Sequence, residues 1–181
     1  MGASQSGPPR VLVFGAPNAG RKTLVRALEQ DAPQPLELVL PESNLDMGSA
    51  ADVVVYVIDG TQPAQWAGES SRMLDTLHSV NSRLGELVPL CVCVNKRDVE
   101  HSAPARQVVE QLRLTGDVCA AVGGRVWRVV DASGLAGDVA ELRRVIRHLV
   151  DAGRIKPTSI LAPRWRGTSS GDAQGACASL P

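Results

Sequence analysis

Residues 15–23 combine two glycines and two basic side chains at a spacing suited to binding a phosphate group. They read Gly-Ala-Pro-Asn-Ala-Gly-Arg-Lys-Thr, and they lie between a short apolar run at 11–14 and a helical pattern that follows at once. In such a context the backbone N–H groups of the loop and of the helix N-terminus converge on a phosphate. We therefore predict that Gly15 and Gly20 belong to a phosphate-binding loop, although a glycine-rich turn without a ligand is an alternative.

The loop departs from the standard phosphate-binding pattern at its last two positions. That pattern asks for Gly, four residues, Gly, Lys and then Ser or Thr, whose hydroxyl ligates magnesium. Aligned without a gap, Arg21 takes the place of the lysine and Lys22 takes the place of the hydroxyl, and an ammonium cannot ligate a cation. A one-residue bulge would restore Lys22 and Thr23 to the pattern, but it would rotate the apolar face of the following helix away from the sheet.

Two further motifs have the residue types that recognise a guanine base. The apolar run at 90–94 ends in Asn95-Lys96-Arg97-Asp98, and the run at 126–130 ends in Asp131-Ala132-Ser133. Together with the phosphate loop, they resemble the motifs of the Ras-like GTPase superfamily in order and position. The resemblance implies that Asp98 accepts two hydrogen bonds from guanine, that the stem of Lys96 stacks on the ring, and that the Ala132 N–H meets the guanine oxygen. It covers residues 10–150.

Parts needed for phosphoryl transfer are absent from the sequence. That reaction needs metal ions, a residue that holds the attacking water and segments clamped to the γ-phosphate. Only positions 31–52 separate the first helix from the next strand, so we expect the usual β-hairpin to be reduced to one strand. The best Asp-x-x-Gly candidate, 46–49, ends in Ser, and no catalytic Gln follows it. We therefore expect neither hydrolysis nor nucleotide-dependent switching, so the chain is predicted not to be an enzyme.

These motifs must be positioned by alternating strands and helices. Continuous apolar runs at 11–14, 53–58, 90–94 and 126–130, with a weaker one at 36–40, are typical of strands covered on both faces. Helical patterns separate them. We predict a three-layer α/β fold with a mostly parallel five-stranded sheet of the P-loop small-GTPase kind and a reduced switch region. The expected spatial order is 36–40, 10–14, 53–58, 89–94 and 126–130.

Length and composition indicate one domain with tails. The chain has 181 residues, and its 19 basic residues balance its 19 acidic residues, which argues against direct binding to nucleic acid. We expect a flexible N-terminus at 1–9, the small-GTPase-like domain at 10–150, an extension at 151–166 that docks on the body or on a partner, and a disordered tail at 167–181. The four cysteines fit no zinc spacing, and no metal site is predicted.

The chain resembles the centromere protein M family of pseudo-GTPases in three features. These are the short segment before the 53–58 strand, the long helix after residue 69 and the apolar extension. The resemblance implies a non-catalytic, protein-binding scaffold of the inner kinetochore, in the constitutive centromere-associated network of the nucleus. Its partner would be a helical-repeat subunit like centromere protein I. No cofactor is expected beyond weak GDP or GTP binding without magnesium, because the base-reading motif at 95–98 persists here but looks lost in that family.

An Arf-like GTPase is the alternative. That group also has Gly to Gly followed by a Lys-Thr-Thr run, and its N-terminus is acylated. The first six residues, Met-Gly-Ala-Ser-Gln-Ser, fit the myristoylation pattern at Gly2, although a disordered start fits them equally well. In this alternative the chain binds guanine nucleotides, acts in membrane traffic and lies in the cytoplasm, associated with membranes only if acylated.

Overall fold

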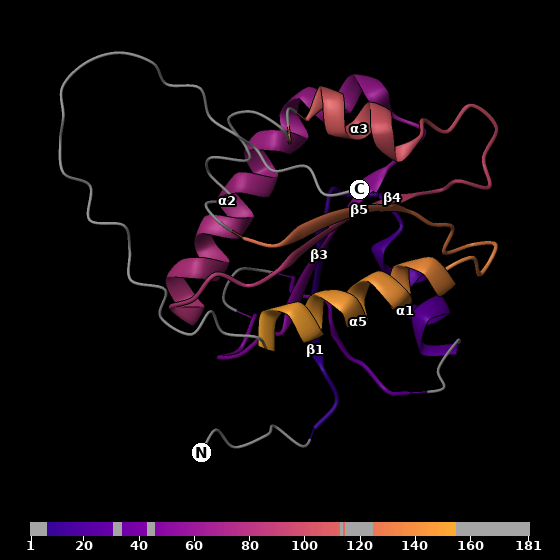
Figure 1. The fold of residues 1–181 in the computed structure, drawn as a ribbon. Helices are drawn as coiled ribbons and strands as arrows, with labels where there is room; N and C mark the ends of the chain where they lie inside the picture. The colour runs from indigo at the N-terminus through magenta and orange to yellow at the C-terminus, as the bar shows by residue number, and fades with distance from the viewer. Residues whose placement is uncertain (1–6, 31–33, 43–45, 113, 115–124, 155–181) are drawn as a thin grey trace, which may run out of the picture.

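A single parallel sheet forms the centre of the molecule. The computed structural model describes residues 7–30, 34–42, 46–112, 114 and 125–154 (Figure 1). Its five strands lie in the spatial order β2-β1-β3-β4-β5, and every neighbouring pair is parallel. The predicted strand order and fold class are therefore confirmed. The strands are β1 (Arg10–Gly15), β2 (Glu37–Val39), β3 (Val53–Asp59), β4 (Leu90–Asn95) and β5 (Trp127–Asp131).

Helices cover both faces of this sheet, which gives the three layers (Figure 1). Helices α1 (Arg21–Gln30) and α5 (Ala140–Arg154) pack on one face, whereas α2 (Trp66–Leu84) and α3 (Ala105–Gln111) pack on the other. A short 3₁₀ helix, η1 (Pro63–Gln65), leads into α2. Helices α1, α2 and α3 lie in the connections between parallel strands, as a doubly wound sheet requires.

The continuous apolar runs arise because alternate side chains of each strand enter different cores. Along β3, Val55 packs toward α1 and α5, and the next residue, Tyr56, packs toward α2 and α3. Cys91 and Cys93 both face the α1 and α5 side, as their spacing predicts. Burial raises the pKa of the Cys91 thiol to about 12 and moves that of Cys93 in the same direction, so both thiols are protonated at neutral pH.

One arginine connects the beginning and the end of the described domain. Arg143 of α5 is only 6% exposed, and its guanidinium donates to the carbonyl oxygen of Leu28 in the last turn of α1. It also donates to the carbonyl of Gln34, with an N–O distance of 3.0 Å. The last carbonyls of a helix have no partner within the helix. A side chain from α5 therefore caps α1.

The region between α1 and β3 contains one strand in its described part, as the shortened sequence predicts. Strand β2 has three residues, fewer than the predicted 36–40, and it pairs in parallel with β1 from Arg10 onward. Beyond it, Gly48 lies against the side chain of Arg10, and its carbonyl accepts a hydrogen bond from Nε of Arg83 at 3.2 Å. Arg10 begins β1, so the 46–48 segment lies at the amino edge of the sheet.

Helix α5 extends to Arg154, four positions beyond the predicted end of the domain. Residues 155–166 of the predicted 151–166 extension, the tail at 167–181 and Gly2 lie outside the described residues. None of the helices in the described ranges has the length and apolar content that crossing a bilayer requires.

Candidate functional site

Four strand ends bring the predicted site residues to one edge of the sheet. Strands β1, β3, β4 and β5 are parallel and paired in register, with Gly15 opposite Val57 and Asp59 opposite Asn95. The loops after these strands therefore meet at the carboxyl edge. Ligands of doubly wound sheets bind in this place.

The loop between β1 and α1 has the backbone geometry of a phosphate cradle. Asn18 and Gly20 have positive φ values of 64° and 85°, and Gly15 has a φ of 146°. A Cβ on Gly15 would lie 2.2 Å from the Val57 carbonyl oxygen, so β1 can approach β3 here only with glycine. Successive backbone N–H groups in such a turn form a concave site for an anion.

Helix α1 begins at Arg21, directly after Gly20. The Leu24 N–H donates to the Gly20 carbonyl at 2.9 Å, so Gly20 accepts the first hydrogen bond of the helix. Leu24, Val25 and Leu28 are buried, in agreement with the gap-free alignment of the loop. Arg21 is half-buried and Lys22 and Thr23 are exposed at the helix N-terminus, where the helix dipole favours negative charge.

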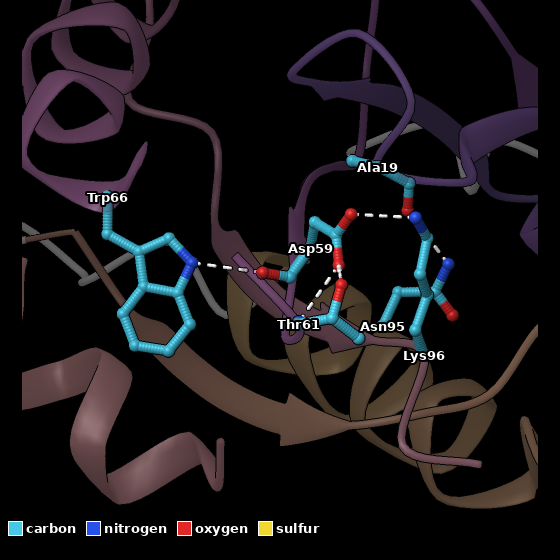
Figure 2. Close-up of polar contacts among 6 residues, drawn as sticks. All are labelled: Ala19, Asp59, Thr61, Trp66, Asn95 and Lys96. Carbon is cyan, nitrogen blue, oxygen red and sulfur yellow. Dashed lines mark hydrogen bonds and ion pairs between the residues drawn. The ribbon is translucent and has the colours of Figure 1, made fainter. Parts of the chain in front are cut away.

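Asn95 joins the phosphate loop to the base-reading side of the site. Asn95 is 3% exposed, and its Nδ2 donates to the Ala19 carbonyl at 2.9 Å (Figure 2). Its Oδ1 accepts from the Gly134 N–H at 3.0 Å. A Cβ on Gly20 would lie 2.4 Å from the same Nδ2, so the loop passes very close to the side chain. One amide therefore fixes the spacing of two loops that are far apart in the sequence.

Lys96 is held by Asp59 at the end of β3. Its Nζ lies 2.6 Å from the Asp59 carboxylate, which also accepts from the hydroxyl of Thr61 at 2.6 Å and from its N–H at 2.9 Å (Figure 2). Burial raises the pKa of Asp59, but the hydrogen bonds from Lys96 and Thr61 outweigh this effect and lower it below its usual value. The buried indole of Trp66 donates to the Asp59 carbonyl at 3.0 Å. The Lys96 ammonium is thus neutralised within the protein.

Asp98 lies exposed at the rim beside the loop after β5. One of its carboxylate oxygens accepts from the hydroxyl of Ser133, which in turn accepts from the Ala136 N–H at 3.0 Å. The Ala132 N–H donates to the Val94 carbonyl at 2.9 Å. This hydrogen bond continues the pairing of β4 and β5. A guanine oxygen that contacts the Ala132 N–H would therefore have to share it with the Val94 carbonyl or displace that carbonyl.

Two residues of the site escaped sequence reasoning. Asp59 directly follows an apolar run, and this position is the one feature of the sequence that indicates a carboxylate at the carboxyl edge of the sheet. No sequence pattern indicated Gly134, since its role is to allow close contact between two backbone segments. A Cβ on Gly134 would lie 2.8 Å from the Leu24 backbone, so the loop after β5 packs directly on the start of α1.

The assembled site has two chemically different ends. Arg21 and Lys22 make no ion pair within the described part of the chain, whereas Lys96 and Arg97 are paired with Asp59 and Asp131. The loop and helix end therefore suits a phosphate group. The Asp98 end offers an exposed acceptor for N–H donors. Together they fit a nucleotide with a base that carries adjacent N–H groups.

Comparison with known proteins agrees with this arrangement. No family model matches the chain. A curated relative, ADP-ribosylation factor-like protein 3 from Pongo abelii, is 26% identical over 137 residues, which cover 71% of this chain and 78% of the relative. The fold is similar to the solved Arl6 BBS3 small GTPase from Trypanosoma brucei with the bound nucleotide analogue GppNp. There the TM-score is 0.62 at 18% identity, covering 81% of this chain and 99% of the other.

These findings support the predicted resemblance to small GTPases, and they correct one prediction. The expectation that the chain is not an enzyme is wrong on this comparison, because its relatives are Arf-like GTPases, which are enzymes. That expectation was drawn from Lys22 and the short 31–52 segment. Catalysis of phosphoryl transfer depends chiefly on positioning and charge stabilisation, and cationic side chains can also stabilise charge. A replaced metal ligand was therefore insufficient ground for predicting that the chain is not an enzyme. The resemblance to centromere protein M is not shown.

Proposed function

We propose that this protein binds guanine nucleotides as an Arf-like small GTPase. The observation that carries the proposal is the double hydrogen bond of Asn95, which holds the Ala19 carbonyl of the phosphate loop and the Gly134 N–H of the base-side loop at one edge of the sheet. That connection serves a ligand with a phosphate at one end and a base at the other. Of the two functions predicted from the sequence, the Arf-like one has relatives that support it.

Each end of the site has a role in this proposal. The N–H groups of Asn18, Gly20 and the first residues of α1 hold the phosphates, with Arg21 in the place of the usual lysine. At the other end the Asp98 carboxylate accepts from the two N–H donors of guanine. The Asp59 ion pair holds the ammonium of Lys96 and leaves its methylene stem to lie against the base.

Calorimetry with GDP and ADP tests the base preference. We expect GDP to bind at least about tenfold more tightly than ADP, since adenine has no N–H pair for Asp98. In Asp98→Asn, GDP binding should weaken, whereas xanthosine diphosphate should gain affinity, because its carbonyl can accept from the new amide. Asp75→Asn, an exposed carboxylate on α2, is the matched control and should behave like the wild type. Equal affinity for GDP and ADP would contradict the proposal.

Membrane attachment forms a separate part of the proposal. Myristoylation of Gly2 fits the Arf-like interpretation, and a single acyl chain gives marginal, reversible membrane binding. The intact mass of the protein from a host with N-myristoyltransferase would show the added acyl group, and Gly2→Ala would lack it. Kinetochore localisation and a helical-repeat partner stay predictions from sequence resemblance.

A further inference from the structure

We propose that the nucleotide site works without a resident magnesium ion, with Arg21 and Lys22 supplying the positive charge that the metal supplies in related sites. This inference rests on the proposed function, because it concerns how the same site holds the phosphates. Two observations support the inference. One is the position of Lys22 in the first turn of α1, and the other is the position of the acidic residues that could hold a metal.

The hydroxyl position of the phosphate loop is occupied by Lys22. Helix α1 begins at Arg21, and Gly20 accepts the first helical hydrogen bond from Leu24, so the loop contains no inserted residue. In the standard pattern the second residue after the last glycine carries the magnesium-binding hydroxyl. Thr23 comes one position later and is rotated by about 100° around the helix axis. Its backbone lies on the side that Gly134 covers, where a Cβ would be 3.1 Å from the Thr23 carbonyl carbon.

No acidic group in the described residues replaces the missing ligand. The Asp-x-x-Gly candidate beginning at Asp46 lies at the amino edge, where Gly48 contacts Arg10 and Arg83, whereas the phosphate loop lies at the carboxyl edge. Asp59 is at the correct edge, but Lys96 and Thr61 occupy its carboxylate. Within the described ranges, no three His, Cys, Asp or Glu side chains are placed to share a metal. These residues therefore do not fit a resident magnesium ion.

The charge that a diphosphate needs is nevertheless available. Arg21 and Lys22 are adjacent at the helix N-terminus, and in the described part of the chain neither forms an ion pair. Two full positive charges equal that of a divalent cation, and the helix dipole adds to them. Arginine and lysine are both established binders of phosphate oxygens. The phosphates can thus be neutralised by the protein alone.

Calorimetric titration of nucleotide-free protein with GDP, in excess magnesium and in excess EDTA, tests the inference. We expect the two dissociation constants to agree within about twofold, which is a negligible difference in binding free energy. Binding that is about tenfold or more tighter in magnesium would overturn the inference while leaving the proposed function intact. Failure to bind GDP in either buffer would overturn both.

Variants of the helix N-terminus identify the groups responsible. Lys22→Thr restores the hydroxyl, and we expect it to weaken GDP binding in EDTA by about tenfold and to make binding magnesium-dependent. Arg26→Ala removes an exposed cation one turn further along the same helix and should leave both affinities unchanged. If Lys22→Thr binds GDP in EDTA as tightly as the wild type does, Lys22 does not replace the metal, and the inference fails.

Discussion

Replacing Asn95 should destabilise the protein because this amide joins two loops inside the fold. Asn95→Ala removes the donor to the Ala19 carbonyl at 2.9 Å and the acceptor of the Gly134 N–H at 3.0 Å. All three residues are buried. Each lost hydrogen bond costs about 1 kcal/mol, and a partner left buried and unsatisfied raises this to about 1–3 kcal/mol. We therefore expect the free energy of unfolding to fall by about 2–4 kcal/mol.

Urea unfolding followed by circular dichroism measures this loss, provided that the dependence of the unfolding free energy on urea stays constant among variants. Gln62→Ala is the control, because it removes an exposed side-chain amide without a capping hydrogen bond, and it should change stability by less than about 0.5 kcal/mol. Asn95→Asp keeps the acceptor for Gly134 and loses only the donor, so at neutral pH it should still be clearly destabilised. If both Asn95 variants unfold like the control, the two loops are held by other contacts and the reasoning is refuted.

Three further predictions concern backbone packing, pH and thiol chemistry. Gly134→Ala should lower the thermal midpoint of unfolding by the equivalent of about 1–3 kcal/mol. Gly68 is exposed in α2 and has nothing within 4 Å of an added Cβ, so Gly68→Ala should raise the midpoint slightly. Equal effects of the two substitutions would contradict the close contact of Gly134 with α1. Asp59 has a lowered pKa in the folded state, so its ionised carboxylate stabilises the fold at pH values above the pKa of the unfolded carboxyl group. This contribution is lost as the pH falls through the pKa of the folded state. The free energy of unfolding, measured at a series of acidic pH values, should therefore show a drop that Asp59→Asn lacks. Peptide mapping after native alkylation at neutral pH should find Cys91 and Cys93 unmodified, since both thiols are buried and protonated, and labelling of either without unfolding would refute this.

The sequence predicted the sheet because its strands are buried on both faces. Runs such as 53–58 and 90–94 are apolar throughout, and this pattern is typical of central parallel strands. The order of the strands followed from alternating helices and the handedness of their connections. Strand β2 was less accurate, since an edge strand of three residues with intermediate burial leaves a weak apolar pattern.

The site was predicted in its parts but not in its connections. Glycines and polar residues after strands identified Gly15, Gly20 and Asn95 without giving their mutual contacts, which depend on three-dimensional proximity. No local pattern indicates that a Gly134 backbone passes within van der Waals distance of α1. The prediction that the chain is not an enzyme is contradicted by its Arf-like relative. It rested on individual replaced residues, which do not report the charge balance of a whole site.

The guanidinium of Arg143 has a consequence for the order in which the chain becomes structured. Its acceptors, the carbonyls of Leu28 and Gln34, precede it by 115 and 109 residues. Contacts of such long sequence separation form late, because the intervening chain must first lose its conformational freedom. While the ribosome is still making α5, the end of α1 lacks this cap, and the nascent N-terminal segment must wait for the last helix before it acquires native stability. Truncated products that stop before Arg143 should therefore be substrates for cellular proteases even though they contain the entire phosphate loop.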